Sequence, residues 1–537
     1  MRPAAHGWAL SIAIPLVVGA AIPAAFPAAA DATYLPQERV PTNSPVYREL
    51  ERLMATYHRA PRSPSTRPLR VQEILAYLNA LEIEHPEVFG DPAMIRIRRE
   101  VDPDAPATRG AFLRITGDQD EIITASPYVS LTYDEDVKNR PDINRDYRIG
   151  VQIAASIDSN SIFVFDGYEG TASQGGRGTP NFGTLNAVIE GVDLNSWMEE
   201  AYAELAISKV RLLVGHTWLR WGPGRDGTLS LSDAAPALDM IRGDAGFARN
   251  WHGQWFVSLI DPGPQTYLAG HRVEWTFHSH VTIGLTELAR FDGTSQGLLY
   301  FIPIVPYSFW EKRPKSVPPG AVPGDTTGLA LGKNNILSGV DISWHVRPGF
   351  RLWGEFLIDD ISFSRDYKPD MIGWQAGVEE RWRLGDVDDR GRVKAIGVAV
   401  EYNRVNNFTY SAWHGHNFGN RGYPFGFLYG PDVMQVSAEA AYEHHANLEL
   451  RLRAEWRRKG EGSIGDAWIP SEGKVDAGAM SGIIERDARL SAQLIYTPSR
   501  MIRLEATVGA ASFKSEDHRN VGAETVIPFR VAAKLKW

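Results

Sequence analysis

Two pairs of histidines are the residues best suited to hold a metal ion. The segment WHGH (413–416) places two histidines two residues apart, and EHH (443–445) places two side by side. A zinc site needs further ligands at a recognisable spacing, and neither pair has one. The acidic segment 133–146 lacks the glycine and the terminal glutamate of an EF-hand calcium loop. We therefore expect no metal site and no cofactor.

The residue types needed for hydrolysis or phosphate binding form no catalytic motif. Asp359 and Asp360 are neighbours in a predicted strand, so their side chains point to opposite faces and cannot act as the acid and base of a glycosidase. GLALGK (328–333) is one residue short of a phosphate-binding loop. No Ser/His or Asp/His group has a defined lipase or protease motif. The sequence therefore predicts a protein that is not an enzyme.

Alternating hydropathy accounts for most of the chain. NLELRLRAEWRR (447–458) places leucine, alanine and tryptophan on one face and glutamate and arginine on the other. Such period-two alternation predicts a strand, and it recurs at 340–346, 374–384, 502–509 and 529–537. The outer face of a soluble β-sandwich would rarely be so uniformly charged, so the pattern favours a membrane barrel over an array of sandwiches.

The connections between these segments are alternately short and long. The long ones are expected at 171–196, 222–246, 306–336, 406–432, 459–485 and 514–528. If 298–304 (LLYFIPI) is counted as a strand, all long loops fall at one end and the total is about 18, an even number as bacterial barrels require. A bilayer tolerates strands only in a closed barrel. We predict an all-β transmembrane β-barrel of antiparallel strands over residues 111–537, with its apolar face towards lipid and a polar lumen.

The first 32 residues predict a signal peptide. Arg2 gives a positive start, residues 8–21 an apolar core, and residues 28–32 an A-x-A cleavage site. No other segment offers ~20 uninterrupted apolar residues. The chain has no cysteine, which suits passage through an oxidising periplasm, and its net charge of −9 argues against a nucleic-acid partner. We therefore expect an exported protein of the outer membrane.

Residues 33–110 differ from the rest because their apolar residues follow helical spacing. Ser44-Pro45 is a helix-start pair followed by a helix to Tyr57, and a second helix is expected over 71–81. Two short amphipathic helices need a surface to pack on. We predict a small N-terminal helical module that plugs the barrel from the periplasmic side, although a free periplasmic module is the alternative.

The chain ends on an alternating strand with a terminal aromatic residue. In FRVAAKLKW, Phe529, Leu535 and Trp537 share one face, which looks like the C-terminal signal read by the outer-membrane assembly machinery. The 16 Trp, 19 Tyr and 21 Phe of the chain suit aromatic girdles at the two membrane interfaces. We expect this machinery, outer-membrane lipids and lipopolysaccharide as partners of a monomer.

Residues 218–236, WLRWGPGRDGTLSLSDAAP, contain a turn that neither a helix nor a strand could continue, at Gly222, Pro223 and Gly224. This segment resembles the W-G-P-G…L-S…A-P signature of the capsule assembly Wzi family. RLWGEFLIDD (351–360) and the stretch 423–443 also look like segments of that family, as do the two predicted helices. The resemblance covers nearly all of the mature chain.

The resemblance implies a barrel closed by helices on the periplasmic side and a surface lectin that anchors capsular or extracellular polysaccharide and assists capsule assembly. Such a lectin needs aromatic rings for sugar faces, polar partners for hydroxyls and, for acidic polymers, arginine. The residues offered by the two loops and a neighbouring strand are Trp218, Arg220, Trp221, Arg225, Asp233, Arg242, Trp251, His252, Trp413, His414, Arg421 and Tyr423, with Arg249, Tyr410, His416 and Asn417 beside them.

Structural roles are equally consistent with several of these residues. Arg220 suits an ion-pair ladder in the lumen, and Trp218 and Trp221 alternate badly, so at least one of them suits a girdle. The turn at Gly222–Gly224 suits a loop that folds inward and occludes the barrel. The alternative function is a diffusion channel or polysaccharide export pore, and the lumen is what would distinguish it from a lectin.

Overall fold

The computed structural model describes residues 34–102, 113–117, 121–134, 145–171, 188–189, 192–248, 250–261, 265–292, 300–302, 305–308, 334–361, 369–385, 393–412, 415–466, 468, 476 and 478–536. The predicted signal peptide and Trp537, the last residue of the predicted assembly signal, lie outside these residues.

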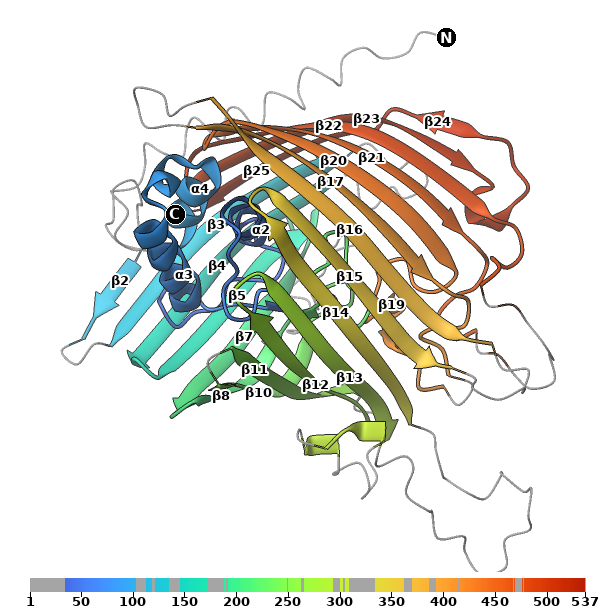
Figure 1. The fold of residues 1–537 in the computed structure, drawn as a ribbon, viewed down its shortest axis with the longest axis horizontal. Coiled ribbons are helices and arrows are strands. Elements are labelled where there is room, and N and C mark those ends of the chain that lie inside the picture. Colours follow the sequence, from blue (N-terminus) through green and yellow to red (C-terminus); the bar gives the residue numbers. More distant parts are fainter. Residues whose placement is uncertain are drawn as a thin grey trace, which may run out of the picture.

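A closed antiparallel barrel of 18 strands forms most of the molecule (Figure 1). Its strands are β3 (Ile122–Asp134), β4 (Arg145–Asp158), β5 (Ser161–Thr171), β7 (Val192–Ile207), β8 (Val210–Thr217), β10 (Leu238–Ala248), β11 (Trp251–Asp261), β12 (Thr266–Phe277), β13 (Val281–Asp292), β14 (Asn335–Arg347), β15 (Phe350–Asp360), β16 (Met371–Leu384), β17 (Lys394–Val405), β20 (Val433–His445), β21 (Leu448–Lys459), β22 (Glu485–Ser499), β23 (Ile502–Lys514) and β25 (Phe529–Lys536). The barrel closes where β25 pairs with β3. The predicted fold class is confirmed.

Shorter strands lie beside or inside this barrel. They are β1 (Thr66–Arg67), β2 (Leu113–Thr116), β6 (Val188–Ile189), β9 (Arg220–Trp221), β18 (Gly419–Asn420), β19 (Tyr423–Pro424) and β24 (Glu524–Val526). Of these, β1 and β9 pair with each other and not with the wall of the barrel.

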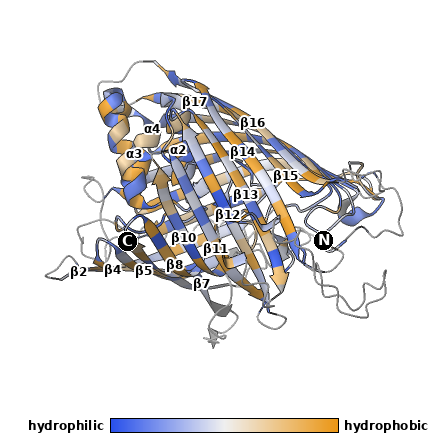
Figure 2. Ribbon diagram, turned by 60° about the horizontal axis from the view of Figure 1, so that its bottom comes forward, coloured by the Kyte–Doolittle hydropathy of each residue, from blue (hydrophilic) through white to orange (hydrophobic). Residues whose placement is uncertain are grey.

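Hydrophobic and hydrophilic residues alternate along the strands (Figure 2). On β21, Leu450, Leu452 and Trp456 are exposed on the outside, whereas Glu449 is buried on the opposite face. Successive side chains of a strand point to opposite faces, so the period-two pattern alone requires this arrangement.

Two details of the predicted strand map are wrong. The described part of LLYFIPI, residues 300–302, contains no strand, and Tyr300 is buried there with its ring stacked on Phe291 at 4.6 Å between centroids. The segment is apolar because it packs against the barrel as part of a loop. The expected loop 222–246 is shorter than predicted, because β10 begins at Leu238.

The tight turns between strands lie at one rim, which we call the short-turn rim, and the long loops lie at the other, the long-loop rim. The short turns include residues 159–160, 208–209, 278–280 and 446–447. The N-terminal helices gather at the short-turn rim, beside the end of the chain (Figure 1).

Three α-helices and one short 3-10 helix form the N-terminal module: α2 (Val46–Tyr57), α3 (Val71–Glu84), η1 (Pro86–Gly90) and α4 (Pro92–Val101). Helices α2 and α3 occupy the predicted segments, and α4 was not predicted. Their apolar faces form one core that includes Leu53, Leu78 and Ile97. Among the described helices, none is long and apolar enough to cross a membrane.

Buried ion pairs attach this module to the barrel wall. Arg52 of α2 lies 2.5 Å from Glu449 of β21, and Arg381 of β16 lies 2.9 Å from Asp91 at the start of α4. Hydrogen bonds between backbone groups also join it to the short-turn rim, from Gly349 to Ala55. The module therefore lies against the lumen and the short-turn rim as a plug.

Candidate functional site

Residues 218–237, which we call the W-G-P-G loop, turn into the lumen after β8. Two backbone contacts with the N-terminal module hold them there. Strand β9 pairs with β1, with Trp221 opposite Thr66, and the Gly222 amide donates to the Ser65 carbonyl at 2.8 Å. The loop is thus part of a small sheet inside the barrel and does not extend outward from the rim.

The glycines of this loop are required by its close approach to the barrel wall. Gly222 has a φ of 130°, and a Cβ on it would lie 2.8 Å from the Glu355 carboxylate. A Cβ on Gly224 would overlap the carbonyl oxygen of Gly227. Side chains larger than hydrogen are excluded at both positions, which explains the Gly-Pro-Gly turn.

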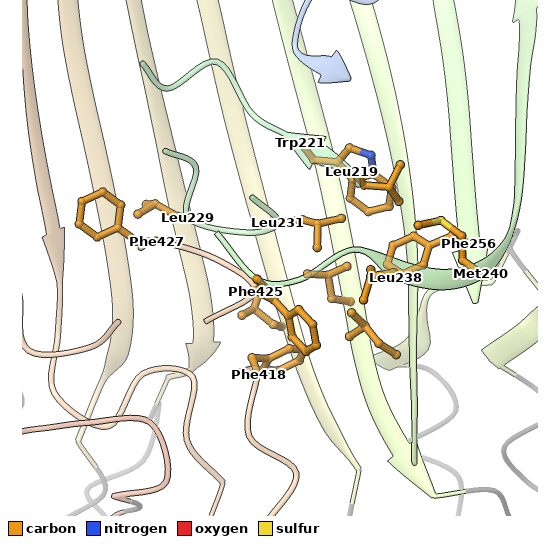
Figure 3. Close-up of a cluster of buried hydrophobic side chains, with 14 of the residues drawn as sticks. Leu219, Trp221, Leu229, Leu231, Leu238, Met240, Phe256, Phe418, Phe425 and Phe427 are labelled. Carbon is orange, nitrogen blue, oxygen red and sulfur yellow. The ribbon is translucent and has the colours of Figure 1, made fainter. Parts of the chain in front are cut away.

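Trp221 anchors an apolar layer across the lumen (Figure 3). The side chain is 0 % exposed, its ring meets Phe256 edge-on at 5.3 Å between centroids, and its Nε1 donates to Gln254 Oε1 at 2.5 Å. The loop 406–432 completes the layer with Phe418, Phe425 and Phe427.

The two loops are joined by hydrogen bonds as well as by apolar packing. Tyr410 donates its hydroxyl to the Leu229 carbonyl at 2.6 Å, and the Ser232 amide donates to the Phe425 carbonyl at 2.6 Å. Burial raises the pKa of Tyr410. We call the two loops together the lumen layer, because they fill the barrel on the long-loop side of the helical module.

Charged residues fasten the W-G-P-G loop to the opposite wall of the barrel. Arg225 lies 3.0 Å from Glu379 of β16 and 2.7 Å from Glu439 of β20. Burial alone would lower the pKa of Arg225, but these two carboxylates outweigh it and raise the pKa. The next residue, Asp226, pairs with Arg453 of β21 at 2.8 Å.

Burial and charge also act in opposite directions on Asp226. Burial favours its neutral form, but the charge and hydrogen bond of Arg453 outweigh burial and hold the pKa of this carboxyl below its usual value. The loop therefore crosses the lumen as a charged strap whose tip is held by β16, β20 and β21.

Five predicted site residues lie inside this layer: Trp218, Arg220, Trp221, Arg225 and Asp233. Trp218 donates its Nε1 to the Ala235 carbonyl at 3.1 Å. The Arg220 guanidinium donates to the Gly224 carbonyl and lies 3.6 Å from Asp233. These contacts hold the loop in its folded shape and leave Trp221 no surface with which to stack on a sugar.

Three other predicted residues belong to strands β10 and β11. Arg242 and His252 are buried on the lumen face near Asp244, at 3.7 and 3.9 Å. Trp251 begins β11 at the short-turn rim and stacks on Trp275 of the outer surface at 5.5 Å. These three residues do not meet the loops.

Two predicted residues are exposed on the lumen layer. Arg421 and Tyr423 belong to the hairpin formed by β18 and β19, which we call the outer hairpin, and Tyr423 is 37 % exposed. His416 and Asn417 precede this hairpin, and the Asn417 side chain accepts from the Ala412 amide at 2.8 Å. Trp413, His414 and Arg249 lie outside the described residues.

Several residues that build the layer were not predicted. Glu355 accepts from the amides of Leu229 and Ser230 at 2.9 and 2.8 Å, and Glu401 accepts from the Arg225 amide at 2.6 Å. Strand alternation marks both glutamates as lumen-facing, but the partner of each depends on the path of a loop, which carries no periodic signal.

Comparison with known proteins identifies the family of this chain. The sequence profile described as capsule assembly protein Wzi matches residues 186–524. The chain belongs to the Wzi capsule assembly family. No curated protein sequence matches this Wzi-family chain.

Solved structures match this chain at low sequence identity. The Wzi structure from Escherichia coli, described as an outer membrane protein involved in group 1 capsule assembly and as a carbohydrate binding β-barrel, has a TM-score of 0.60 and 14 % identity, over 94 % of this chain and 99 % of that chain. OprD from Pseudomonas aeruginosa has a TM-score of 0.42 and 9 % identity, over 78 % of this chain and 95 % of that chain. OpdK from the same organism has a TM-score of 0.41 and 10 % identity, over 77 % of this chain and 98 % of that chain.

Proposed function

We propose that this Wzi-family chain is an outer-membrane lectin that binds surface polysaccharide at its long-loop rim and retains the polymer on the cell. It acts by binding and not by catalysis. Family membership supports a role in capsule assembly, and the solved Wzi structure is described as carbohydrate-binding. An apolar outer surface and short turns at one rim support insertion in the outer membrane with the long loops outside.

The observation that carries the proposal is the double filling of the lumen. The lumen layer closes the barrel on the side of the long loops, and the helical module occupies the side of the short turns. A polysaccharide chain threading through the barrel would have to displace both. This favours capture of polymer at the outer surface over the alternative of a diffusion channel or export pore.

Among the described residues, the outer hairpin offers the predicted side chains that a polymer can reach. Tyr423 presents an aromatic ring for a sugar face, and Arg421 presents a guanidinium fork for a carboxylate. Trp413 and His414 stay predictions for the same rim. The buried predicted residues, above all Trp221 and Arg225, support this site by fixing the layer on which the hairpin rests.

A deletion strain tests the proposal in the cell. Polysaccharide is assayed separately in the cell fraction and in the medium. An anchor requires the total to stay constant while polymer shifts from cells to medium. Accumulation inside the envelope would instead identify an export component, and unchanged fractions would contradict both functions.

Purified protein tests the location of the site. We expect the double variant Arg421→Ala/Tyr423→Ala to bind the organism's own polymer at least tenfold more weakly, with heat-modifiable migration unchanged. Arg347→Ala is the matched control, because Arg347 is exposed at the short-turn rim. Equal affinity of the double variant and the control would move the site away from the outer hairpin.

A further inference from the structure

The lumen is not filled evenly around its circumference. Inward-facing residues of β12 to β16, such as Arg272, Glu355 and Glu379, are buried by the W-G-P-G loop and the N-terminal module. On β21 and β23 the inward-facing Arg451 and Arg503 keep part of their surface. The strands that close the barrel therefore border space that neither the loops nor the helices occupy.

This space is a cavity of about 650 Å³ between the helical module and the closing strands. We call it the closing-strand chamber. Its lining begins with Arg500 and Met501 in the turn between β22 and β23, and it reaches Asp226 and Ala234 of the W-G-P-G loop. Because the lumen layer lies at that second end, solutes would enter from the short-turn rim.

The chamber carries an excess of positive charge. Ten lining side chains are arginine or lysine and five are aspartate or glutamate. Most of those carboxylates already have a cation: Glu51 lies 2.5 Å from Arg67, and Glu505 lies 2.5 Å from Arg503. Carboxylates outside the lining pair with other lining cations, as Glu439 does with Arg48 and Glu449 with Arg451. The excess of positive charge therefore rests on Arg500, Arg530, Lys534 and Lys536, which form no ion pair with a described residue.

Arg500 is the clearest uncompensated group. Its Nη1 and Nη2 atoms are buried and have no hydrogen-bond partner among the described residues. Burial lowers the pKa of this guanidinium, and Glu100 offsets the lowering only in part. A buried guanidinium with unused donors is costly unless an anion or water satisfies it.

Two further cations line the chamber along β25, the last strand. Arg530 and Lys534 both line it from β25, and Lys534 lies 5.5 Å from the centre of the Tyr128 ring. They are four residues apart on one face of a strand, which spaces them by ~13 Å. Together with Arg500 they form a row of cations along one wall.

We infer that the closing-strand chamber binds an oxyanion carried by a solute of sugar size, either a carboxylate of an acidic saccharide or a phosphate. The volume lies within the ~300–1,000 Å³ of typical small-molecule sites. Guanidinium forks match carboxylate and phosphate oxygens in two-point hydrogen bonds. This site is separate from the outer hairpin and does not depend on polymer binding there.

Equilibrium binding to the full-length protein in detergent tests the inference, with trigalacturonate, inorganic phosphate and neutral maltotriose as probes. We expect binding of at least one anionic probe, weakened by raised salt, and none of maltotriose. Binding of trigalacturonate alone assigns the site to acidic saccharides, and binding of phosphate assigns it to phosphate-bearing solutes. Absence of both, or equal binding of maltotriose, would overturn the inference.

The variants Arg500→Gln/Arg530→Gln should weaken anion binding about tenfold or more, while Arg347→Gln should leave it unchanged. Arg500→Lys/Arg530→Lys keeps the charge, so this double variant should retain most of the anion binding. If it does, the weaker binding of the glutamine double variant reflects lost charge and not misfolding. Unweakened binding in the glutamine pair would contradict the chamber site. Arg421→Ala/Tyr423→Ala distinguishes the two proposals, because it removes two side chains of the outer hairpin and should leave chamber binding intact.

Discussion

Arg225 connects the tip of the W-G-P-G loop to two strands on the opposite wall of the barrel. Its guanidinium is shared between Glu379 and Glu439, and its own amide donates to Glu401. Each of these carboxylates faces a lumen from which the loop excludes water. The residue therefore stabilises the layer by neutralising charges that the strand pattern places inside.

We expect Arg225→Ala to lower the free energy of unfolding by about 3–5 kcal/mol, because removing one partner leaves buried charges without compensation. Thermal or urea-induced unfolding of the purified barrel in detergent measures the change. The exposed pair of Arg347 and Glu380 at the other rim is the control, and Arg347→Ala should cost about 1 kcal/mol or less. Equal losses of unfolding free energy in Arg225→Ala and Arg347→Ala would show that the contacts of Arg225 contribute no more than an exposed ion pair does.

The protonation of Glu38 makes the stability of the fold depend on pH. Its carboxylate is buried, accepts from the Leu35 amide at 3.0 Å and from the Gln152 side chain, and lies in the field of Lys536 and Asp166. Burial raises the pKa of Glu38 to about 8, although the Leu35 amide and Lys536 favour the charged form. The folded state thus holds a proton that the unfolded chain releases near pH 4.5.

Because this pKa is raised, the stability that the group contributes is present at low pH and is lost as the pH rises towards 8. We expect Glu38→Gln to remove this loss, so that the variant gains stability over the wild type as the pH increases from 5.5 to 8.5, by about 1.4 kcal/mol per pH unit at most. Unfolding curves at several pH values measure it. A constant difference between the two proteins would contradict the assignment.

The helical module and the W-G-P-G loop act as one element, because β1 and β9 form a single two-stranded sheet. Removing the module takes away the helices and also the backbone partner of Trp221. The closure nearest the short turns and the closure nearest the long loops are therefore coupled through Thr66 and Arg67.

Deleting residues 34–101 should raise conductance in planar bilayers well above that of the full-length protein. The deletion empties the short-turn side of the lumen and frees β9 to leave it. Trp221→Ala in the full-length chain is the comparison, since it weakens the lumen layer and keeps the helices in place. If the deletion left conductance unchanged, the two long loops alone would be sufficient to close the barrel.

Periodicity made most elements predictable, and its limits explain the errors. Strands β14, β16, β21, β23 and β25 and the helices α2 and α3 were found because the spacing of their apolar residues is regular over seven residues or more. Helix α4 was missed although its signals are present: Asp91 caps the Ala93 amide at 2.9 Å, Pro92 follows, and Ala93, Ile97 and Val101 share one face. The arginines between these positions interrupt the apolar pattern, so the short apolar face of α4 was not recognised in the sequence.

The candidate site was less predictable than the fold. The sequence correctly marked the W-G-P-G segment as a turn, and the inward-folding alternative describes the observed loop. The sequence alone could not show that Trp221 would be enclosed by Phe256 and Gln254, because those contacts depend on a strand that follows later in the chain. Exposure at the outer hairpin likewise depends on how two loops meet.

At the scale of the whole molecule, the barrel is a single sheet whose first and last strands must find each other. The pairing of β25 with β3 runs from Arg530 opposite Asp134 to Lys536 opposite Tyr128. No other contact can replace this seam, since an open edge in lipid would leave backbone groups unpaired. The end of the chain therefore decides whether the barrel forms.

We expect Trp537→Ser to impair assembly, because it removes the terminal aromatic residue from the predicted assembly signal. The fraction of heat-modifiable protein in isolated outer membranes measures assembly. Trp537→Phe is the control and should assemble normally. Normal migration of the serine variant would show that Phe529 and Leu535 are sufficient, or that the signal lies elsewhere.

The small sheet of β1 and β9 also limits the routes by which the chain can be assembled. Its first strand is made early, yet it ends up enclosed by a wall that is completed only when the last strand pairs. If the seam formed first, β1 could reach β9 only through the short-turn rim, because paired strands leave no opening in the wall. By either route, backbone hydrogen bonds and ion pairs retain the enclosed segment without any covalent bond.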